Sequence, residues 1–250
     1  MALDLTKYEE EAANAIKLFW GTKDKAALDQ AARGVNDVGT RGAVTAGKHL
    51  DAFVPLLSGI AKAQGLKNLS FHMGRQVPTI PGFFRPTKEW DLIVMHGKQL
   101  AAVFELKSIG SSFGNNMNNR SEEAIGAGHD FWTAFRESAF GQDAPKPFLG
   151  WVMIMRECEK SMSPVGSSEK FFPVFPEFKG ASYAQRADIL CRRLVQENLY
   201  SATALMLTDD EKGKADGHYR HLSDSASFRR FLATYAGHMT GLATEAATKS

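Results

Sequence analysis

Apolar residues recur at helical spacing in several stretches of this chain. Near the amino terminus, Tyr8, Ala12, Ile16 and Phe19 would share one face of a helix that ends at Gly21. The same spacing predicts further helices, at about 23–33, 50–60, from 121 onward, 182–200 and 225–243.

Apolar runs of strand character occupy the middle of the chain. Residues 91–107 are predicted to form two strands joined by a tight turn at Gly97. The near-continuous apolar run 148–155 is typical of a strand covered on both faces, and 203–208 predicts another short strand. Three prolines make 77–86 an extended segment rather than a helix.

Polar or glycine-rich segments separate these elements. Residues 34–47 are rich in glycine but lack the Gly-Lys-Ser/Thr ending of a phosphate-binding loop. Residues 108–120 are predicted to be a polar loop, followed by a helix that turns Ile125, Trp132 and Phe135 toward the core. Loops are also predicted at 158–178 and 209–217.

The order of the elements predicts the fold class. Helices, a hairpin, and then helices alternating with strands indicate one mixed α/β domain over residues 1–250. We expect a central mixed sheet flanked by helices, with additional helices at both ends of the chain.

The composition limits the class of protein. Apolar residues make up 44% of the 250 residues, which is enough for a packed core. With 30 Lys and Arg against 28 Asp and Glu, a polycation that binds through charge alone is excluded, whereas a local basic surface is not. Cys158 and Cys191 lack zinc-binding spacing and are expected to be reduced thiols. The sequence shows no signal peptide and no apolar run of membrane-spanning length, so we expect a soluble, intracellular protein that binds no membrane.

The predicted hairpin brings three charged residues together. Side chains in a strand alternate between faces, so Glu105 and Lys107 point the same way. The hairpin can place Asp91, at the far end of its first strand, beside Glu105. Such charges are costly to bury unless they pair or bind a cation.

This set of residues suits metal-assisted hydrolysis of a phosphodiester. Two carboxylates, with the backbone carbonyl of Leu106 as a third ligand, fit a hard cation such as Mg²⁺. A nearby lysine can orient or activate the attacking water and stabilise charge on a phosphate. The alternative is chance spacing, in which Glu105 and Lys107 form an ordinary exposed ion pair. The apolar strand before them, and the Asn-rich segment with an arginine after them, favour a nuclease that acts on DNA.

The sequence resembles a known family over most of its length. Besides the hairpin, the residues that carry the resemblance lie at 40–51, 90–94, 105–108, 112–126, 129–137, 172–178 and 182–186. The sequence is similar to the XhoI-type family of type II restriction endonucleases, within the PD-(D/E)XK nuclease superfamily, over roughly residues 36–240. One departure is that Trp90, not proline, precedes Asp91.

The resemblance implies a fold, an activity and partners. The fold would be restriction-endonuclease-like, with its catalytic core at about 70–210. The activity would be Mg²⁺-dependent cleavage of double-stranded DNA at a palindrome, CTCGAG for the family, leaving 5′-phosphate and 3′-hydroxyl ends. The partners would be a second copy of the chain and a separately encoded DNA methyltransferase, in the cytoplasm of a bacterium or archaeon. Asp91 and Glu105 would bind Mg²⁺, and Lys107 would position or activate the water.

Two segments are candidates for reading DNA. The residues after the catalytic strand include side chains suited to adenine and guanine, namely Asn115, Asn116, Asn118, Asn119 and Arg120. The second segment runs through Arg41 and Lys48, where basic groups can contact phosphates or bases. Asparagine is also a common turn residue, which is the structural alternative for the first segment.

Two other functions compete with site-specific cleavage. A structure-specific repair or junction nuclease would keep the same catalytic residues but require branched DNA. A DNA-binding protein without catalysis would keep the reading surface alone.

Overall fold

The computed structural model describes residues 6–32, 51–73, 79–167, 169 and 171–248, and for residues 24–32 it describes the backbone alone. The α-helices are α1 (Thr6–Ala32), α2 (Phe53–Ala63), α3 (Phe113–Arg136), α4 (Glu159–Met162), α5 (Tyr183–Gln196), α6 (Asp210–Ala215) and α7 (Phe228–Thr248). The strands are β1 (Leu69–Met73), β2 (Ile80–Pro81), β3 (Thr87–Lys88), β4 (Leu92–His96), β5 (Gln99–Ile109), β6 (Phe148–Arg156) and β7 (Ala202–Thr208). Short 3₁₀ turns lie at Pro176–Phe178 and Asp224–Ala226.

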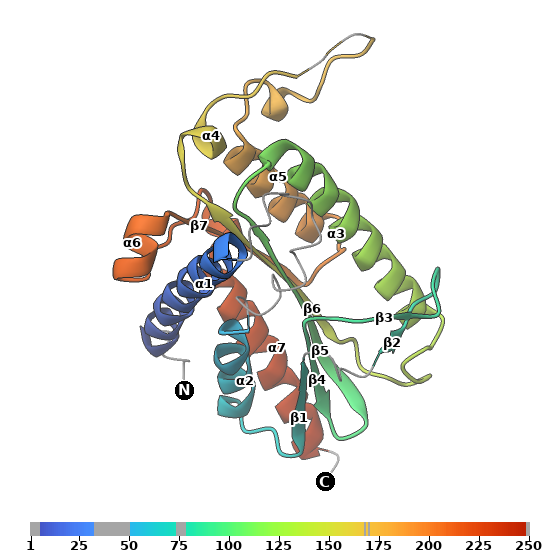
Figure 1. Cartoon of the computed structure of the whole chain (residues 1–250). Helices are drawn as coiled ribbons and strands as arrows, with labels where there is room; N and C mark the ends of the chain where they lie inside the picture. The colour runs from blue at the N-terminus through green and yellow to red at the C-terminus, as the bar shows by residue number, and fades with distance from the viewer. Residues whose placement is uncertain (1–5, 33–50, 74–78, 168, 170, 249–250) are drawn as a thin grey trace.

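A five-stranded mixed sheet forms the centre, in the order β1-β4-β5-β6-β7 (Figure 1). The pairs β1–β4 and β4–β5 are antiparallel, whereas β5–β6 and β6–β7 are parallel. Helices α1, α2 and α7 cover one face, and α3 and α5 cover the other (Figure 1). The predicted α/β architecture, with helices on both faces of a mixed sheet, is confirmed. Strands β2 and β3 form a separate antiparallel pair.

The alternation of β5 explains where its charged residues point. Phe104 and Leu106 belong to the core under α7, whereas Val103 and Ile109 belong to the core under α3 and α5. Glu105 lies between Phe104 and Leu106, so it faces α3 together with Lys107. The predicted hairpin is also confirmed: β4 and β5 meet at a turn in which Gly97 has φ +59°.

Two predicted helix boundaries on the amino-terminal side were wrong. Gly21 does not end the first helix, because α1 continues to Ala32 and includes the stretch predicted as a second helix. A helical glycine costs only about 1 kcal/mol relative to alanine. The packing of Tyr8, Ile16 and Phe19 in the core outweighs this cost.

The segment 108–120 was wrongly predicted as a loop. Strand β5 continues to Ile109, and α3 begins at Phe113, well before the predicted start at 121. Phe113 and Met117 are buried one turn apart, so tertiary packing overrides the weak helix propensity of the asparagines. Ile125 was also misplaced, since it is 48% exposed, whereas Trp132 is buried as expected.

The segment 209–217 contains a short helix rather than only a loop. The side chain of Asp209 caps α6 by accepting hydrogen bonds from the backbone N–H groups of Glu211 (3.0 Å) and Lys212 (2.7 Å). The prediction of free cysteines is confirmed, with Cys158 partly buried and Cys191 buried. Within the described residues, no helix combines the length and the apolar character needed to cross a membrane.

Gly150 in β6 offers a test of how tightly the sheet packs against α7. A Cβ at this position would lie 2.7 Å from Phe104 Cδ1 and 2.9 Å from both Phe148 Cε1 and Phe231 Cζ. Gly150→Ala is expected to destabilise the fold by about 1–3 kcal/mol, because these buried rings must shift. Urea denaturation followed by circular dichroism measures the change.

Gly237 on α7 provides the matched control. Among the described residues, no atom outside the neighbouring backbone of α7 lies within 4 Å of a Cβ built there, so Gly237→Ala should stabilise the fold by up to about 1 kcal/mol. Equal effects of the two substitutions would contradict the packing of β6 against α7.

Candidate active site

The charged residues of the hairpin converge at the end of the β4–β5 pair. The register pairs Leu92 with Phe104, so one further step along the hairpin places Asp91 opposite Glu105. The backbone N–H of Leu106 donates a 2.7 Å hydrogen bond to Asp91 Oδ2. This bond fixes the first carboxylate against the strand that carries the second.

Lys107 lies between the two carboxylates. Its ammonium is 3.9 Å from Asp91 Oδ2 and forms a close ion pair with Glu105 Oε1. Glu105 is buried, whereas the Asp91 side chain is 38% exposed. The structure therefore brings the three predicted catalytic residues together, at a site open to solvent on the side of Asp91.

Sequence reasoning missed a second lysine at the site. Lys88 Nζ donates a 2.9 Å hydrogen bond to Glu105 Oε2, and it lies 4.1 Å from the centre of the buried Trp90 ring. The sequence shows only that Lys88 stands two residues before Trp90, and this spacing does not indicate a contact with Glu105. Trp90 thus helps to position a charge beside Glu105.

The electrostatics of the site separate the two carboxylates. Burial raises the pKa of Asp91, and the neighbouring Glu105 carboxylate raises it further. Burial also acts to raise the pKa of Glu105, but the ammonium groups of Lys107 and Lys88 outweigh it and lower that pKa. Burial disfavours the ammonium of Lys107, yet Glu105 and Asp91 together raise its pKa. Glu105 is therefore the more firmly ionised carboxylate, held between two cations.

A pocket of about 280 Å³ opens beside this cluster. It is lined by residues of the turn before β3 and of β3, β5, β6 and α3, namely Arg85, Lys88, Glu105, Lys107, Arg120, Glu122, Glu123, Ala124, Gly126, Ala127 and Trp151. It is called the catalytic pocket below, because the predicted catalytic residues Glu105 and Lys107 line it. Arg120 forms a close ion pair with Glu123, while its Nε is buried without a hydrogen-bond partner among the described residues. The Arg120 guanidinium thus brings positive charge to the pocket wall, where it suits an anionic ligand.

Glu123 needs a correction of its own. The predicted helix start at 121 would place Glu123 in the first helical turn, but α3 begins ten residues before Glu123, at Phe113. Glu123 instead lies on the wall of the catalytic pocket, 49% exposed on its side chain and paired with Arg120.

The predicted DNA-reading asparagines lie on α3 rather than on a loop. Asn116 donates a 2.7 Å hydrogen bond to the carbonyl of Ser111, and Asn118 donates a 2.9 Å bond to Glu122 Oε1. Asn115 and Asn119 are exposed. Asn116, Arg120 and Glu123 follow one another at helical spacing, so Asn116 shares the helix face of the catalytic pocket. The other candidates, Arg41 and Lys48, lie outside the described residues.

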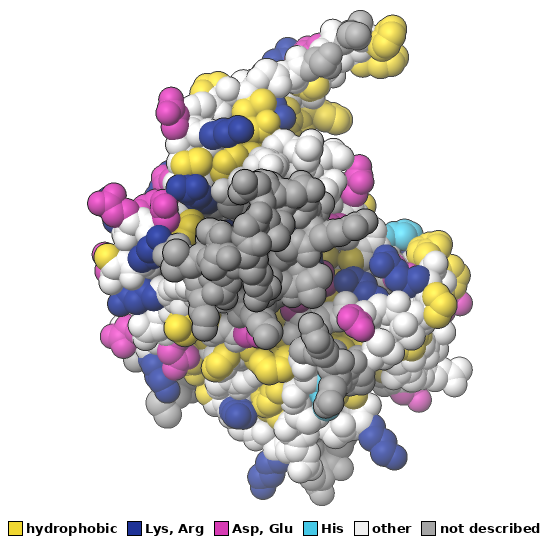
Figure 2. Space-filling model, in the orientation of Figure 1, with side chains coloured by type: hydrophobic (Ala, Val, Ile, Leu, Met, Phe, Trp, Pro, Cys, Tyr) yellow, Lys and Arg dark blue, Asp and Glu magenta, His cyan; other side chains and the backbone are white. Residues whose placement is uncertain are grey.

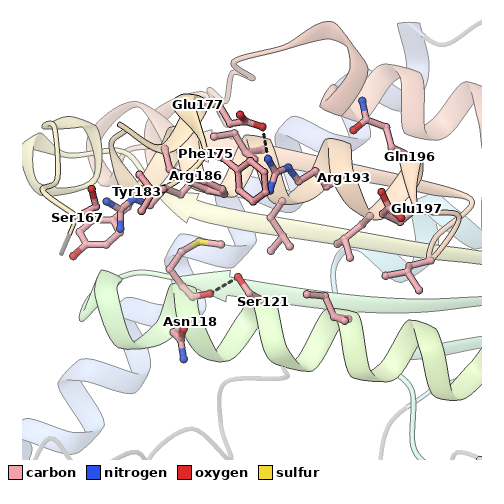
Figure 3. Close-up of a pocket in the computed structure, with 18 of the residues that line it drawn as sticks. Asn118, Ser121, Ser167, Phe175, Glu177, Tyr183, Arg186, Arg193, Gln196 and Glu197 are labelled. Atoms are coloured by element: carbon pink, nitrogen blue, oxygen red, sulfur yellow. Dashed lines mark hydrogen bonds and ion pairs between the residues drawn. The ribbon is translucent and has the colours of Figure 1, made fainter. Parts of the chain in front are cut away.

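Asn118 faces a different hollow. It lines a groove of about 1080 Å³ between α3 and α5, together with Ser121 (Figure 3). The exposed Ile125, which was predicted to face the core, lines the same groove. Arg186 and Arg193 project from α5 at the opposite wall, and Arg193 pairs with Glu177 (Figure 3). This larger groove shares no lining residue with the catalytic pocket. The asparagine cluster is therefore divided between two faces of one helix.

Comparison with known proteins shows the family. The family described as restriction endonuclease XhoI matches residues 29–221. The chain belongs to this family.

Similar proteins agree with the assignment. The chain is 45% identical to the type II restriction enzyme XhoI of Xanthomonas vasicola over 197 residues, which are 78% of each chain. It is 42% identical to the type II restriction enzyme BstVI of Geobacillus stearothermophilus over 217 residues, covering 84% of this chain and 94% of that enzyme. It is 47% identical to AbrI, a type II restriction enzyme of Azospirillum brasilense, over 162 residues, covering 64% and 72%. No solved structure gives a significant match.

Family membership establishes the class of enzyme. Type II restriction enzymes are site-specific deoxyribonucleases of restriction–modification systems, and they act on double-stranded DNA. The mixed sheet with helices on both faces accords with a restriction-endonuclease-like fold.

Enzymes of this class generally use a divalent metal ion, and the donors at the site fit one. Asp91 and Glu105 supply carboxylate oxygens, and the Lys107 ammonium lies between them, where positive charge is therefore favoured. Within the described residues no group of three or more His, Cys, Asp or Glu side chains could hold a metal. Mg²⁺ in proteins is commonly coordinated by one or two carboxylates and retains several water ligands. Two carboxylates, with a carbonyl, water and a phosphate as the remaining ligands, would therefore suit Mg²⁺.

Proposed function

We propose that this protein is a Mg²⁺-dependent restriction endonuclease that cleaves double-stranded DNA at the palindrome CTCGAG and leaves 5′-phosphate and 3′-hydroxyl ends. The observation that carries the proposal is the convergence of Asp91, Glu105 and Lys107 beside one pocket, in a chain of this family. Asp91, Glu105 and the carbonyl of Leu106 would hold the metal ion. A bound Mg²⁺ would supply charge neutralisation at the phosphate and make water more acidic.

The side chains around the pocket have distinct roles in this proposal. Lys107 orients the attacking water and stabilises negative charge that develops on the phosphate. Lys88 holds Glu105 from its other side and keeps the carboxylate aimed at the site. Arg120, whose guanidinium lies on the pocket wall, binds an oxygen of the DNA.

Recognition is proposed to use both edges of α3. Asn116, Asn119 and Arg120 share the face of the catalytic pocket, whereas Asn118 lines the groove on another face of the same helix and Asn115 is exposed near its start. Asparagine suits adenine and arginine suits guanine in the major groove. Arg41 and Lys48 are proposed as further DNA contacts on their sequence alone.

The expected partners follow from the symmetry of the site. A palindrome presents the same bases to two copies of one reading surface, so we propose a homodimer related by a two-fold axis.

A cognate methyltransferase encoded separately would protect the host DNA, and the enzyme would act in the cytoplasm. We also propose that residues 1–250 form one domain.

Digestion of a sequenced plasmid tests the proposal. A plasmid with one CTCGAG site should be cut once in Mg²⁺ and left intact in EDTA, and a plasmid with one base pair of the site changed should resist cleavage. Run-off sequencing gives the site and the stagger, and ligation of the products without prior phosphorylation tests for 5′-phosphate ends. Cleavage that requires a branched substrate, or random degradation, would exclude the proposal.

A further inference from the structure

A short turn next to the catalytic pocket is built around a buried charge. Gly82–Pro86, here called the aromatic turn, joins β2 to β3 (Figure 1). Asp130 on α3 is only 2% exposed, and its Oδ1 accepts hydrogen bonds of 2.8 Å from the backbone N–H groups of both Phe83 and Phe84. Its Oδ2 pairs with Arg85 Nε at 2.8 Å. The cost of burying this carboxylate is thus offset by three donors from one turn.

The same contact restricts the sequence of the turn. A Cβ on Gly82 would lie 2.7 Å from Asp130 Oδ2 and 2.9 Å from the carbonyl oxygen of Arg85. Glycine at this position therefore permits the close approach of the turn to α3. The backbone of the aromatic turn is fixed from both sides.

The fixed backbone holds two aromatic rings in solvent. Phe83 is 51% exposed and Phe84 is 65% exposed, and the two rings meet edge to face at 4.9 Å. The Phe84 ring stacks on His129, with ring centres 5.6 Å apart and an interplanar angle of 19°. Because packing and hydrogen bonds already order these rings, little conformational entropy remains to be lost when they bind a partner.

The aromatic turn lies at the rim of the catalytic pocket. Arg85 and Lys88 both line that pocket, and Lys88 contacts Glu105 directly. Figure 2 shows basic side chains gathered beside hydrophobic ones on this flank, over β2, β3 and the end of α3, with a histidine next to them. The Arg85 side chain remains 45% exposed although it pairs with Asp130. A surface of ordered aromatic rings edged by cations suits duplex DNA, in which apolar deoxyribose faces and base edges lie beside phosphates.

We propose that the aromatic turn is a DNA contact of this enzyme, in which Phe83 and Phe84 pack against a base or deoxyribose next to the phosphate that is cut. The inference rests on the proposed function, since DNA must reach Asp91 and Glu105 for cleavage and the turn borders that path. Arg85 contacts a neighbouring phosphate with the exposed part of its guanidinium. Asp130 acts as a positioning residue, because its hydrogen bonds to the backbone of the turn fix where the two rings lie relative to the pocket.

Conservative variants test the contact. Phe83→Leu/Phe84→Leu keeps the apolar character of the exposed turn and removes the flat rings, so the fold is expected to persist. Its Kd for a duplex with one CTCGAG site, measured in Ca²⁺ by fluorescence anisotropy, should rise about tenfold, because aromatic anchors at an interface are lost. Photo-crosslinking to duplexes that carry 5-iodo-deoxyuridine near the site should place a crosslink on residues 83 or 84 of the wild type by mass spectrometry.

The chain provides a matched control. Phe171 and Phe172 are also adjacent and are 89% and 85% exposed, on the segment that projects beyond α4 and α5 (Figures 1 and 2). Phe171→Leu/Phe172→Leu should leave the Kd unchanged.

Asp130→Asn tests the residue that positions the turn. It keeps an acceptor oxygen but loses the negative charge that pairs with Arg85, so it should also raise the Kd.

The outcomes separate the two proposals. If the wild type fails to cut any CTCGAG plasmid, the proposed function fails. If the wild type cuts, but the turn variant binds and crosslinks as the wild type does, only the inference about the turn is overturned. Equal loss of affinity in both phenylalanine pairs would also overturn it, as would a change in sedimentation that shows the turn to be a contact between protein copies.

Discussion

Asp91→Asn is expected to abolish cleavage of a CTCGAG plasmid, with a loss of at least about a thousandfold in the single-turnover rate. The substitution removes the charge of one of the two carboxylates that would hold the metal ion. It keeps an oxygen that can accept the 2.7 Å hydrogen bond from the Leu106 N–H, so the hairpin should stay in place. Binding of the same duplex in Ca²⁺ is expected to remain within a few fold of the wild type.

Asp143→Asn is the control for Asp91. Asp143 is exposed in the segment between α3 and β6 and does not line the catalytic pocket, so its substitution should leave the rate unchanged. Thermal denaturation of both variants verifies that the fold is intact. Full activity of Asp91→Asn would contradict the catalytic assignment, and a wild type that binds but never cuts would indicate a DNA-binding protein without catalysis.

Lys107→Ala is expected to lower the single-turnover rate by about two to four orders of magnitude. The reason is its position: its ammonium contacts Glu105 and lies 3.9 Å from Asp91, so it faces both carboxylates of the site. Binding of Ca²⁺, measured by calorimetry in the presence of DNA, should persist because both carboxylates remain.

Lys88→Ala is the matched comparison, because Lys88 contacts the same carboxylate from the other side. Its ammonium packs on the Trp90 ring and its ion pair is with Glu105, so its role is to hold that residue. A reduction of about tenfold is expected. If the two variants lose the same rate, the distinct role proposed for Lys107 is wrong.

Local patterns in the sequence correctly predicted the hairpin that carries the candidate catalytic residues. The period of two in β5 placed Glu105 and Lys107 on one face, and the turn at Gly97 placed Asp91 opposite Glu105. These relations depend on neighbours within one hairpin, which sequence spacing describes directly. Lys88 was missed because its contact with Glu105 depends on how β3 and Trp90 lie against the hairpin, which spacing does not give.

The start of α3 could not be predicted from propensity. Glycine and asparagine dominate residues 114–119 and favour turns, so the segment was assigned to a loop. Phe113 and Met117 anchor it as helix because the core under α3 and α5 covers them. The spacing of Phe113, Met117, Ala124 and Phe131 was the available signal. Asp130 and the aromatic turn were beyond reach, since 47 residues separate Asp130 from Phe83.

A single rigid helix carries Asn116, the Arg120–Glu123 pair and Asp130. At 1.5 Å per residue, Asn116 and Asp130 are about 21 Å apart along α3, and one inserted residue would turn one end by about 100° relative to the other. Insertions or deletions within this span would therefore rotate Asn116 away from the pocket wall or pull Asp130 out of the turn. The segment 137–147 after α3 is neither helix nor strand, so an inserted residue there would not rotate side chains on α3. Changes of chain length in relatives should therefore concentrate in this segment.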